Sequence, residues 1–229
     1  MPALELSGQN VAYQVRRSAR ARNARIVVHP WDGIEVVVPA RAPANTAERL
    51  VRAHGDWLLA RLAERPAAPQ PLTDGALIPW RGGRLPVHVR PGAGRARLTD
   101  LGLSVAVADV ADHAAVRAAV ERVARAEARR LLTGEVAAAA SALGVHVAAL
   151  SIRDARTRWG SCTSTGRLSF SWRLVLAPPE VLRYVAVHEV CHIVEPNHQP
   201  PFWALVDRML PGWRAQRLWL RRHGPELRF

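Results

Sequence analysis

The 229-residue sequence predicts an α+β fold, with a β-rich N-terminal part followed by a more helical C-terminal part. Short β-type runs separated by glycine and proline dominate residues 1–110, which we expect to contain one helix. A long helical pattern begins near residue 112. From Val145 onward the composition changes, with five of the eight tryptophans, five of the nine histidines and both cysteines. We therefore predict two domains, residues 1–110 and residues 111–229.

The first part of the chain predicts strands followed by a helix. The expected strands are Val11–Arg17, Arg25–His29 and Ile34–Val38, and the turn at Pro30-Trp31-Asp32-Gly33 makes the last two a hairpin. Asn45 and Glu48 have the spacing of a capping box. The helix behind them shows apolar residues at near-helical spacing, at Leu50, Trp57, Leu58 and Leu62. A proline-rich connector follows at residues 66–71.

A second β-type stretch precedes the long helix. Its expected strands are Leu85–Val89, Ala96–Leu98 and Leu103–Val107. Asp112 is the expected N-cap of a helix that runs to Leu143, and Gly144 is its expected C-cap. Gly134 is a position where this helix would bend or divide.

The C-terminal third alternates strands and helices. Strands are expected at Val147–Arg153 and Arg167–Trp172. Pro178, Pro179 and Glu180 start a helix that should run through Tyr184 to about Val194 and stop before Pro196. Further helices are expected from Pro201 and over Trp213–Arg222.

Composition limits the setting and the partners. The N-terminus lacks the basic and apolar regions of a secretory signal, and two cysteines make no disulfide framework, so we expect a cytoplasmic protein. No apolar run is long enough to span a membrane. The net charge of +13 suggests affinity for polyanions such as nucleic acid. However, all these basic residues are arginine and alanine is abundant, which fits a coding-sequence bias equally well.

The segment His188-Glu189-Val190-Cys191-His192 carries the clearest chemical signal. Residues four apart lie on one face of a helix, so the two imidazoles can bind one Zn²⁺. Glu189 would then lie beside the metal, where a general base can take a proton from water and return it to a leaving nitrogen. Apolar residues flank the motif, so its polar side chains would be costly without a partner. The pattern predicts a zinc-dependent metallopeptidase.

A catalytic zinc site needs a third protein ligand and one open position. His198, six residues after His192, is the best candidate because Pro196 ends the helix and allows the chain to turn back. Glu195 is the alternative third ligand. Cys191 faces away from the two histidines and is expected to be a buried structural residue.

Several motifs together resemble the YgjP-like metallopeptidases, which are relatives of the SprT-like zinc proteases. They are Arg158-Trp159-Gly160-Ser161-Cys162, Pro178-Pro179, Tyr184 through His192, Asn197-His198 and Phe202-Trp203. The resemblance implies a minimal zincin-like domain in which a small sheet backs the active-site helix. It also implies a zinc site of His188, His192 and His198 with Glu189 as the catalyst, and it suggests that Arg158–Cys162 lies nearby.

Three further residues invite a substrate-binding role. Arg158 and Trp159 would contact substrate at an edge strand, or else Trp159 packs in the core and Arg158 pairs with a carboxylate. Tyr184 lies one turn before His188 and would stabilise an oxyanion, or else simply packs.

Two other functions compete with that of a peptidase for peptide or protein substrates. In the first, arginines at 16, 17, 20, 22 and 25 dock on nucleic acid and the protease acts on DNA-bound proteins, as SprT-like proteases do. In the second, the chain is a non-catalytic zinc-binding module. The intact Glu189 argues against the second.

Overall fold

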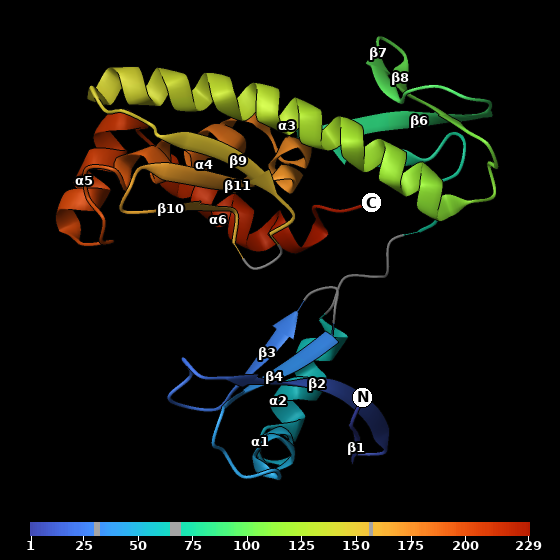
Figure 1. The fold of residues 1–229 in the computed structure, drawn as a ribbon, viewed down its shortest axis with the longest axis vertical. Coiled ribbons are helices and arrows are strands. Elements are labelled where there is room, and N and C mark those ends of the chain that lie inside the picture. The colour runs from blue at the N-terminus through green and yellow to red at the C-terminus, as the bar shows by residue number, and fades with distance from the viewer. Residues whose placement is uncertain (30–32, 65–69, 156–157) are drawn as a thin grey trace. The chain divides into compact units, whose positions relative to one another are not determined.

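The computed structural model describes residues 1–29, 33–64, 70–155 and 158–229. The chain forms two compact units, Met1–Ala68 and Pro69–Phe229 (Figure 1). The boundary predicted at residue 110 falls inside the second unit, because the sheet that precedes it shares an apolar core with the long helix. The expected turn at Pro30-Trp31-Asp32 and most of the expected connector at 66–71 lie outside the described residues.

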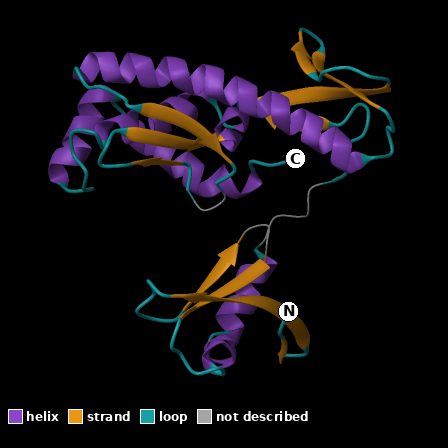
Figure 2. Ribbon diagram, viewed as in Figure 1, coloured by secondary structure: helices purple, strands orange, loops and turns teal. Residues whose placement is uncertain are grey.

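The first unit is a four-stranded sheet packed against two short helices (Figure 2). Its elements are β1 (Ala3–Leu6), β2 (Gln9–Ser18), β3 (Arg25–His29), β4 (Gly33–Pro39), α1 (Thr46–Ala53) and α2 (Gly55–Ala63). The strand order is β1-β2-β4-β3, in which only the β2–β4 pair is parallel. The three predicted strands are therefore found, and β1 is an addition.

The helical part of this unit departs from the prediction. Instead of one helix, α1 and α2 are separated at His54, whose ring Nδ1 lies 2.9 Å from the Leu50 carbonyl. The expected capping box is not formed, since the Asn45 side chain makes no capping bond. Glu48 instead accepts hydrogen bonds from Arg52, one turn further along.

The second unit combines two sheets with the longest helix of the described chain (Figures 1 and 2). Its strands are β5 (Leu77–Trp80), β6 (Gly83–Pro91), β7 (Arg97–Thr99), β8 (Gly102–Val107), β9 (Ala149–Arg153), β10 (Gly160–Cys162) and β11 (Arg167–Ser171). Its helices are α3 (His113–Leu143), η1 (Trp172–Leu176), α4 (Pro179–Cys191), α5 (Pro200–Met209), α6 (Trp213–His223) and η2 (Gly224–Glu226). The sheet orders are β5-β6-β8-β7 and β10-β11-β9.

Helix α3 begins and ends as its sequence predicts. The Asp112 side chain accepts a hydrogen bond of 2.9 Å from the backbone N–H of Ala115. Gly144 takes the left-handed conformation with φ +65° and closes the helix. The helix is unbroken at Gly134 and reaches from the β9–β11 sheet to the β5–β8 sheet (Figure 1).

Helix α4 lies in the core of the second unit, where it contacts α3, α5, α6 and strand β10 of the small sheet. Nine of its thirteen residues are buried, including both neighbours of His188. This burial agrees with the predicted α+β fold, in which a small sheet backs the helix that carries the histidine motif. None of the described helices is both long and apolar enough for a membrane span.

The turn between β5 and β6 supports the start of α4. The backbone N–H of Arg81 donates to the Val175 carbonyl at 2.9 Å, and that of Gly82 donates to the Leu176 carbonyl at 3.3 Å. Gly82 has φ +81°, and a Cβ there would lie 3.0 Å from Cα of Pro178, the N-cap of α4. Only glycine can take this positive φ and also leave room for Pro178 without strain.

We expect Gly82→Ala to destabilise the second unit more than Gly75→Ala. Both glycines have positive φ, at +81° and +77°, so both substitutions incur about 1–2 kcal/mol of left-handed strain. Only the alanine at 82 also meets Pro178, which adds about 1–3 kcal/mol. Urea unfolding followed by tryptophan fluorescence compares the two variants. Equal losses of unfolding free energy in the two variants would show that the contact between residue 82 and Pro178 adds no destabilisation.

Candidate metal centre

Three imidazoles meet at the end of α4. His188 lies in its last turn, His192 caps its C-terminus, and His198 follows in the loop before α5. The Nε2 atom of His198 lies 3.1 Å from Nε2 of His192 and 3.1 Å from Nε2 of His188. Among the described residues, these three form the group of potential ligands close enough for one metal ion.

The loop after α4 brings His198 back to the helix. The helix ends at Cys191 rather than near Val194 as expected. The backbone N–H groups of Val194 and Glu195 both donate to the Cys191 carbonyl, at 3.1 and 2.9 Å, in the turn that follows the helix. The turn that leads to His198 therefore starts three residues earlier than the sequence predicts.

Hydrogen bonds and ring stacking fix the orientation of the imidazoles. His192 donates from Nδ1 to the Glu195 carbonyl at 3.0 Å, which leaves its Nε2 with a free lone pair. Glu195, the alternative third ligand, thus contributes its carbonyl as a support. Phe202 stacks on His192 with ring centroids 4.3 Å apart, and Trp203 stacks on His198 at 5.4 Å. Helix α5 therefore holds the rings from one side.

The donor set suits a metal ion. The pKa of His188 is lowered to about 3, mainly by burial and further by His192, by His198 and by the Arg217 charge. This imidazole is therefore neutral near pH 7. Its buried Nδ1 has no hydrogen-bond partner among the described residues. Three ligands at about 2.0–2.1 Å in a tetrahedral arrangement would place their nitrogens about 3.3 Å apart. The observed 3.1 Å is close to that separation.

Glu189 is buried beside the histidines, with 6% of its surface exposed. Burial raises the pKa of Glu189 to about 7, and the Arg158 charge opposes this rise. The carboxylate packs on β10, since a Cβ at Gly160 would lie only 2.5 Å from Glu189 Oε1. The edge strand therefore approaches the glutamate closely, and only a residue without a side chain allows it.

The three residues predicted to contact substrate surround this site in different ways. Tyr184 is buried, stacks on Trp213 with centroids 6.1 Å apart, and meets the edge of His188 at 5.8 Å. Burial raises the pKa of Tyr184 to about 12, so it keeps its proton. Trp159 is half-buried beside Gly224, and Arg158 is exposed. Their roles toward a substrate stay predictions.

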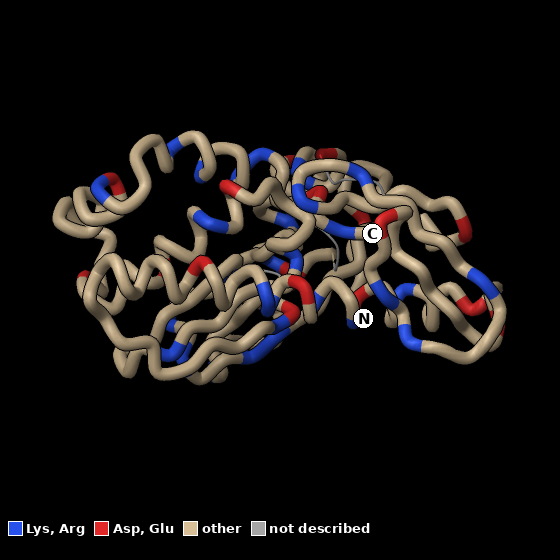
Figure 3. The backbone as a smooth tube through the Cα atoms, turned by 90° about the horizontal axis from the view of Figure 1, so that it is seen from above, with Lys and Arg blue, Asp and Glu red and all other residues tan. Residues whose placement is uncertain are grey.

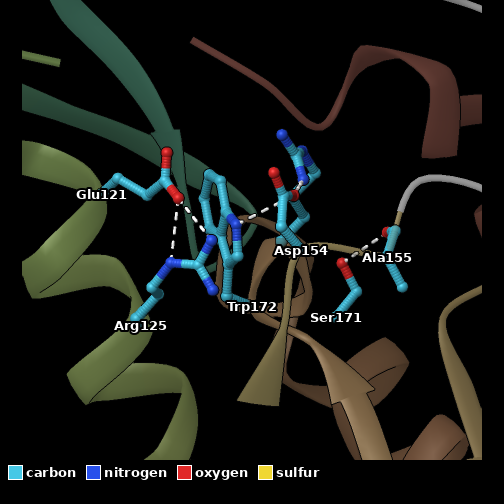
Figure 4. Close-up of polar contacts among 7 residues, drawn as sticks. Glu121, Arg125, Asp154, Ala155, Ser171 and Trp172 are labelled. Carbon is cyan, nitrogen blue, oxygen red and sulfur yellow. Dashed lines mark hydrogen bonds and ion pairs between the residues drawn. The ribbon is translucent and has the colours of Figure 1, made fainter. Parts of the chain in front are cut away.

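Polar contacts fasten the chain just before Arg158 (Figure 4). The Ser171 hydroxyl donates to the Ala155 carbonyl at 3.1 Å, and the Trp172 indole N–H donates to Asp154 at 3.2 Å. The same Asp154 carboxylate pairs with Arg173. These bonds join the end of β9 to the end of β11 and so fix where the segment leading to β10 starts.

Sequence reasoning missed the contribution of α6. Trp213 and Arg217 lie on this helix, and Arg217 sits over the Trp203 ring at 4.9 Å and over the Trp213 ring at 5.8 Å. Their signal was present in the sequence as arginines at positions 214, 217 and 221, a spacing that places them on one helix face. Nothing in the sequence linked that face to His188.

The arginine-rich N-terminal segment belongs to the first unit. Arg16 pairs with Glu35 at 2.7 Å, and Arg17 donates to the carbonyls of Ala40 and Ala42, both at 2.9 Å. Figure 3 shows the basic residues spread along both parts of the chain. The nucleic-acid interpretation therefore stays a prediction.

An α+β unit in which a buried helix and the loop after it bring together three histidines beside a glutamate is typical of the zincin class of metallopeptidases. The chain belongs to the family of YgjP-like metallopeptidase domains, which matches residues 22–223. That match covers most of both units, and it implies a metal ion and a peptide or protein substrate.

Among solved structures, the chain is similar to the metallopeptidase zymogen abylysin of Pyrococcus abyssi. The two share 21% sequence identity over 41% of this chain and 92% of that one, with a TM-score of 0.36. No curated protein matches the chain.

We expect Gly160→Ala to keep the bound metal and to lose about 100-fold in peptide hydrolysis. The new methyl group would displace the Glu189 carboxylate, which lies 2.5 Å from that position, and would leave the three histidines in place. Gly94→Ala is the control, since its Cβ meets only Ala106 at an ordinary 3.5 Å. Metal content and turnover are measured on the same samples. Full activity of Gly160→Ala would mean that β10 does not hold the glutamate.

Proposed function

We propose that this protein is a zinc-dependent peptidase that hydrolyses peptide bonds in cytoplasmic peptides or proteins. His188, His192 and His198 hold the zinc ion, and Glu189 is the general base. The observation that carries the proposal is the meeting of three Nε2 atoms, with two separations of 3.1 Å, beside a carboxylate that is 6% exposed. Three imidazoles leave one tetrahedral position open, as a catalytic zinc site requires.

Zinc at these three nitrogens supplies Lewis acidity toward water and the substrate carbonyl. The remaining chemistry belongs to the protein. Glu189 accepts a proton from the attacking water at a carboxylate oxygen and donates it to the leaving nitrogen. Its pKa of about 7, raised by burial, suits a group that must both take and release a proton near neutral pH.

The edge strand β10 supports binding of an extended peptide. Within the described chain, β10 pairs with β11 alone, so its other edge has backbone groups free to pair. A peptide added there as a further strand would pass Gly160 and therefore Glu189. Arg158 and Trp159 precede this strand and would flank the peptide. Tyr184 is supported as a packing residue, because its ring stacks on Trp213 and meets the His188 ring edge to face.

Glu189→Gln is expected to keep a full equivalent of zinc and to lower kcat at least about 100-fold. The amide cannot take up a proton, whereas the three imidazoles are untouched. Zinc content by atomic spectroscopy and cleavage of a peptide library test both halves of this expectation. Cleavage at the wild-type rate would rule out the general-base role. A wild-type chain that cleaves nothing would instead favour a non-catalytic zinc module.

His192→Ala is expected to lose zinc, because it removes one of the three ligands and its support by the Glu195 carbonyl. His146→Ala is the matched control, since His146 is exposed and lies on a loop outside the cluster. Zinc retained after extensive dialysis should fall well below one equivalent only in the first variant. Stoichiometric zinc in His192→Ala would contradict the ligand assignment.

A further inference from the structure

A cavity of about 510 Å³ is lined in part by Tyr184, whose ring contacts His188 of the candidate metal centre. Its aromatic walls are Trp159, Tyr184 and Trp213, and its basic wall is formed by Arg214, Arg217 and Arg221 of α6. Neither the peptidase chemistry nor the proposed zinc site uses this space.

Two residues that line the cavity, Tyr184 and Trp159, also lie next to residues of the candidate site. The Tyr184 ring meets the His188 ring at 5.8 Å, edge to face. Trp159 directly precedes Gly160, whose backbone supports the Glu189 carboxylate. A substrate group that occupies the cavity would therefore belong to a residue close to the bond that is cleaved.

The basic wall presents charge that the described chain does not neutralise. Arg214 pairs with Asp207 at 3.1 Å, whereas no described carboxylate pairs with Arg217 or Arg221. Positions 214, 217 and 221 are three and four residues apart, so their side chains share one face of α6. Two unpaired guanidinium groups at one wall favour an anion there.

Contacts with the aromatic rings hold Arg217 in place. Its guanidinium lies 4.9 Å from the Trp203 ring centre and 5.8 Å from that of Trp213, and those two rings stack at 4.5 Å. These cation–π contacts hold the guanidinium near the rings, and its N–H groups can still pair with a carboxylate. Leu218 and Leu220 add apolar surface to the same cavity. Together these groups suit a carboxylate carried on a short apolar stem.

We infer that this cavity is a substrate subsite in which Arg217 and Arg221 bind a carboxylate of the peptide close to the scissile bond. The inference rests on the proposed peptidase function. The carboxylate comes from an acidic side chain or from the C-terminus of the peptide, and the aromatic walls pack against the stem that carries it.

Binding to the zinc-loaded Glu189→Gln variant tests the inference without turnover. The probes are blocked alanine hexapeptides with one glutamate at each position in turn, their glutamine counterparts, and glutamine peptides with a free C-terminal carboxylate. Titration calorimetry and quenching of tryptophan fluorescence report the affinity. We expect the best carboxylate-bearing peptide to bind about five- to tenfold more tightly than its blocked glutamine counterpart at low salt.

Arginine variants in the Glu189→Gln background separate this subsite from general attraction by the basic chain. Arg217→Gln and Arg221→Gln should each cut the preference to about twofold or less. Arg222→Gln removes the same charge from the same helix outside the cavity and should keep the preference. Arg221 lies over no aromatic ring of the described residues, so Arg221→Gln still tests the subsite if Arg217→Gln disturbs the tryptophan stack.

The outcomes distinguish this inference from the proposed function. Equal binding of all peptides, or a preference that survives both arginine variants, would overturn the subsite. A wild-type enzyme that cleaves glutamate and glutamine peptides equally well would also overturn it and leave the peptidase standing. Carboxylate binding that depends on Arg217, without cleavage of any peptide by the wild type, would remove the peptidase but keep the carboxylate site.

Discussion

Burial of α4 is the constraint on which the rest of the site depends. Apolar neighbours surround the helix, and α3, α6 and the small sheet pack against it. A charged group in such surroundings loses hydration at a cost of several kcal/mol, so the groups shift toward their neutral forms. His188 is neutral with a pKa of about 3, and Glu189 has a pKa of about 7. A neutral imidazole is the form that ligates metal, and a nearby cation would favour the ionised carboxylate.

Close backbone approach holds this buried helix at two places. Near its N-terminus, the left-handed turn at Gly82 reaches Pro178 and donates to the carbonyl of Leu176. Further along, β10 comes so near that Gly160 lies against Glu189. Both contacts require the absence of a side chain, so the geometry of the glutamate depends on two glycines outside the histidine motif.

Local signals predicted much of the fold and the histidine cluster. Asp112 and Gly144 set the ends of α3 through bonds within one helical turn, and the spacing of His188 and His192 follows from helix geometry. Features that depend on distant contacts were not predictable in this way. The strand β10 has three residues and no period of its own, and it exists because β11 pairs with it. The turn after Cys191 likewise depends on backbone hydrogen bonds, which the residue types in this segment do not predict.

Helix α6 shows that the histidine motif identifies only some of the residues around the candidate site. Arg217 lies nineteen residues after His198, and its guanidinium contacts the stacked rings of Trp203 from α5 and Trp213 from α6. The same stack continues to His198 on one side and to Tyr184 on the other. The His198 imidazole, which we propose as a ligand, and the basic wall of the cavity are therefore parts of one packed layer. If His198 binds the metal and the cavity binds a carboxylate, as we propose, a change in either tryptophan would affect both, because Trp203 contacts His198 and Arg217 and Trp213 stacks on Trp203.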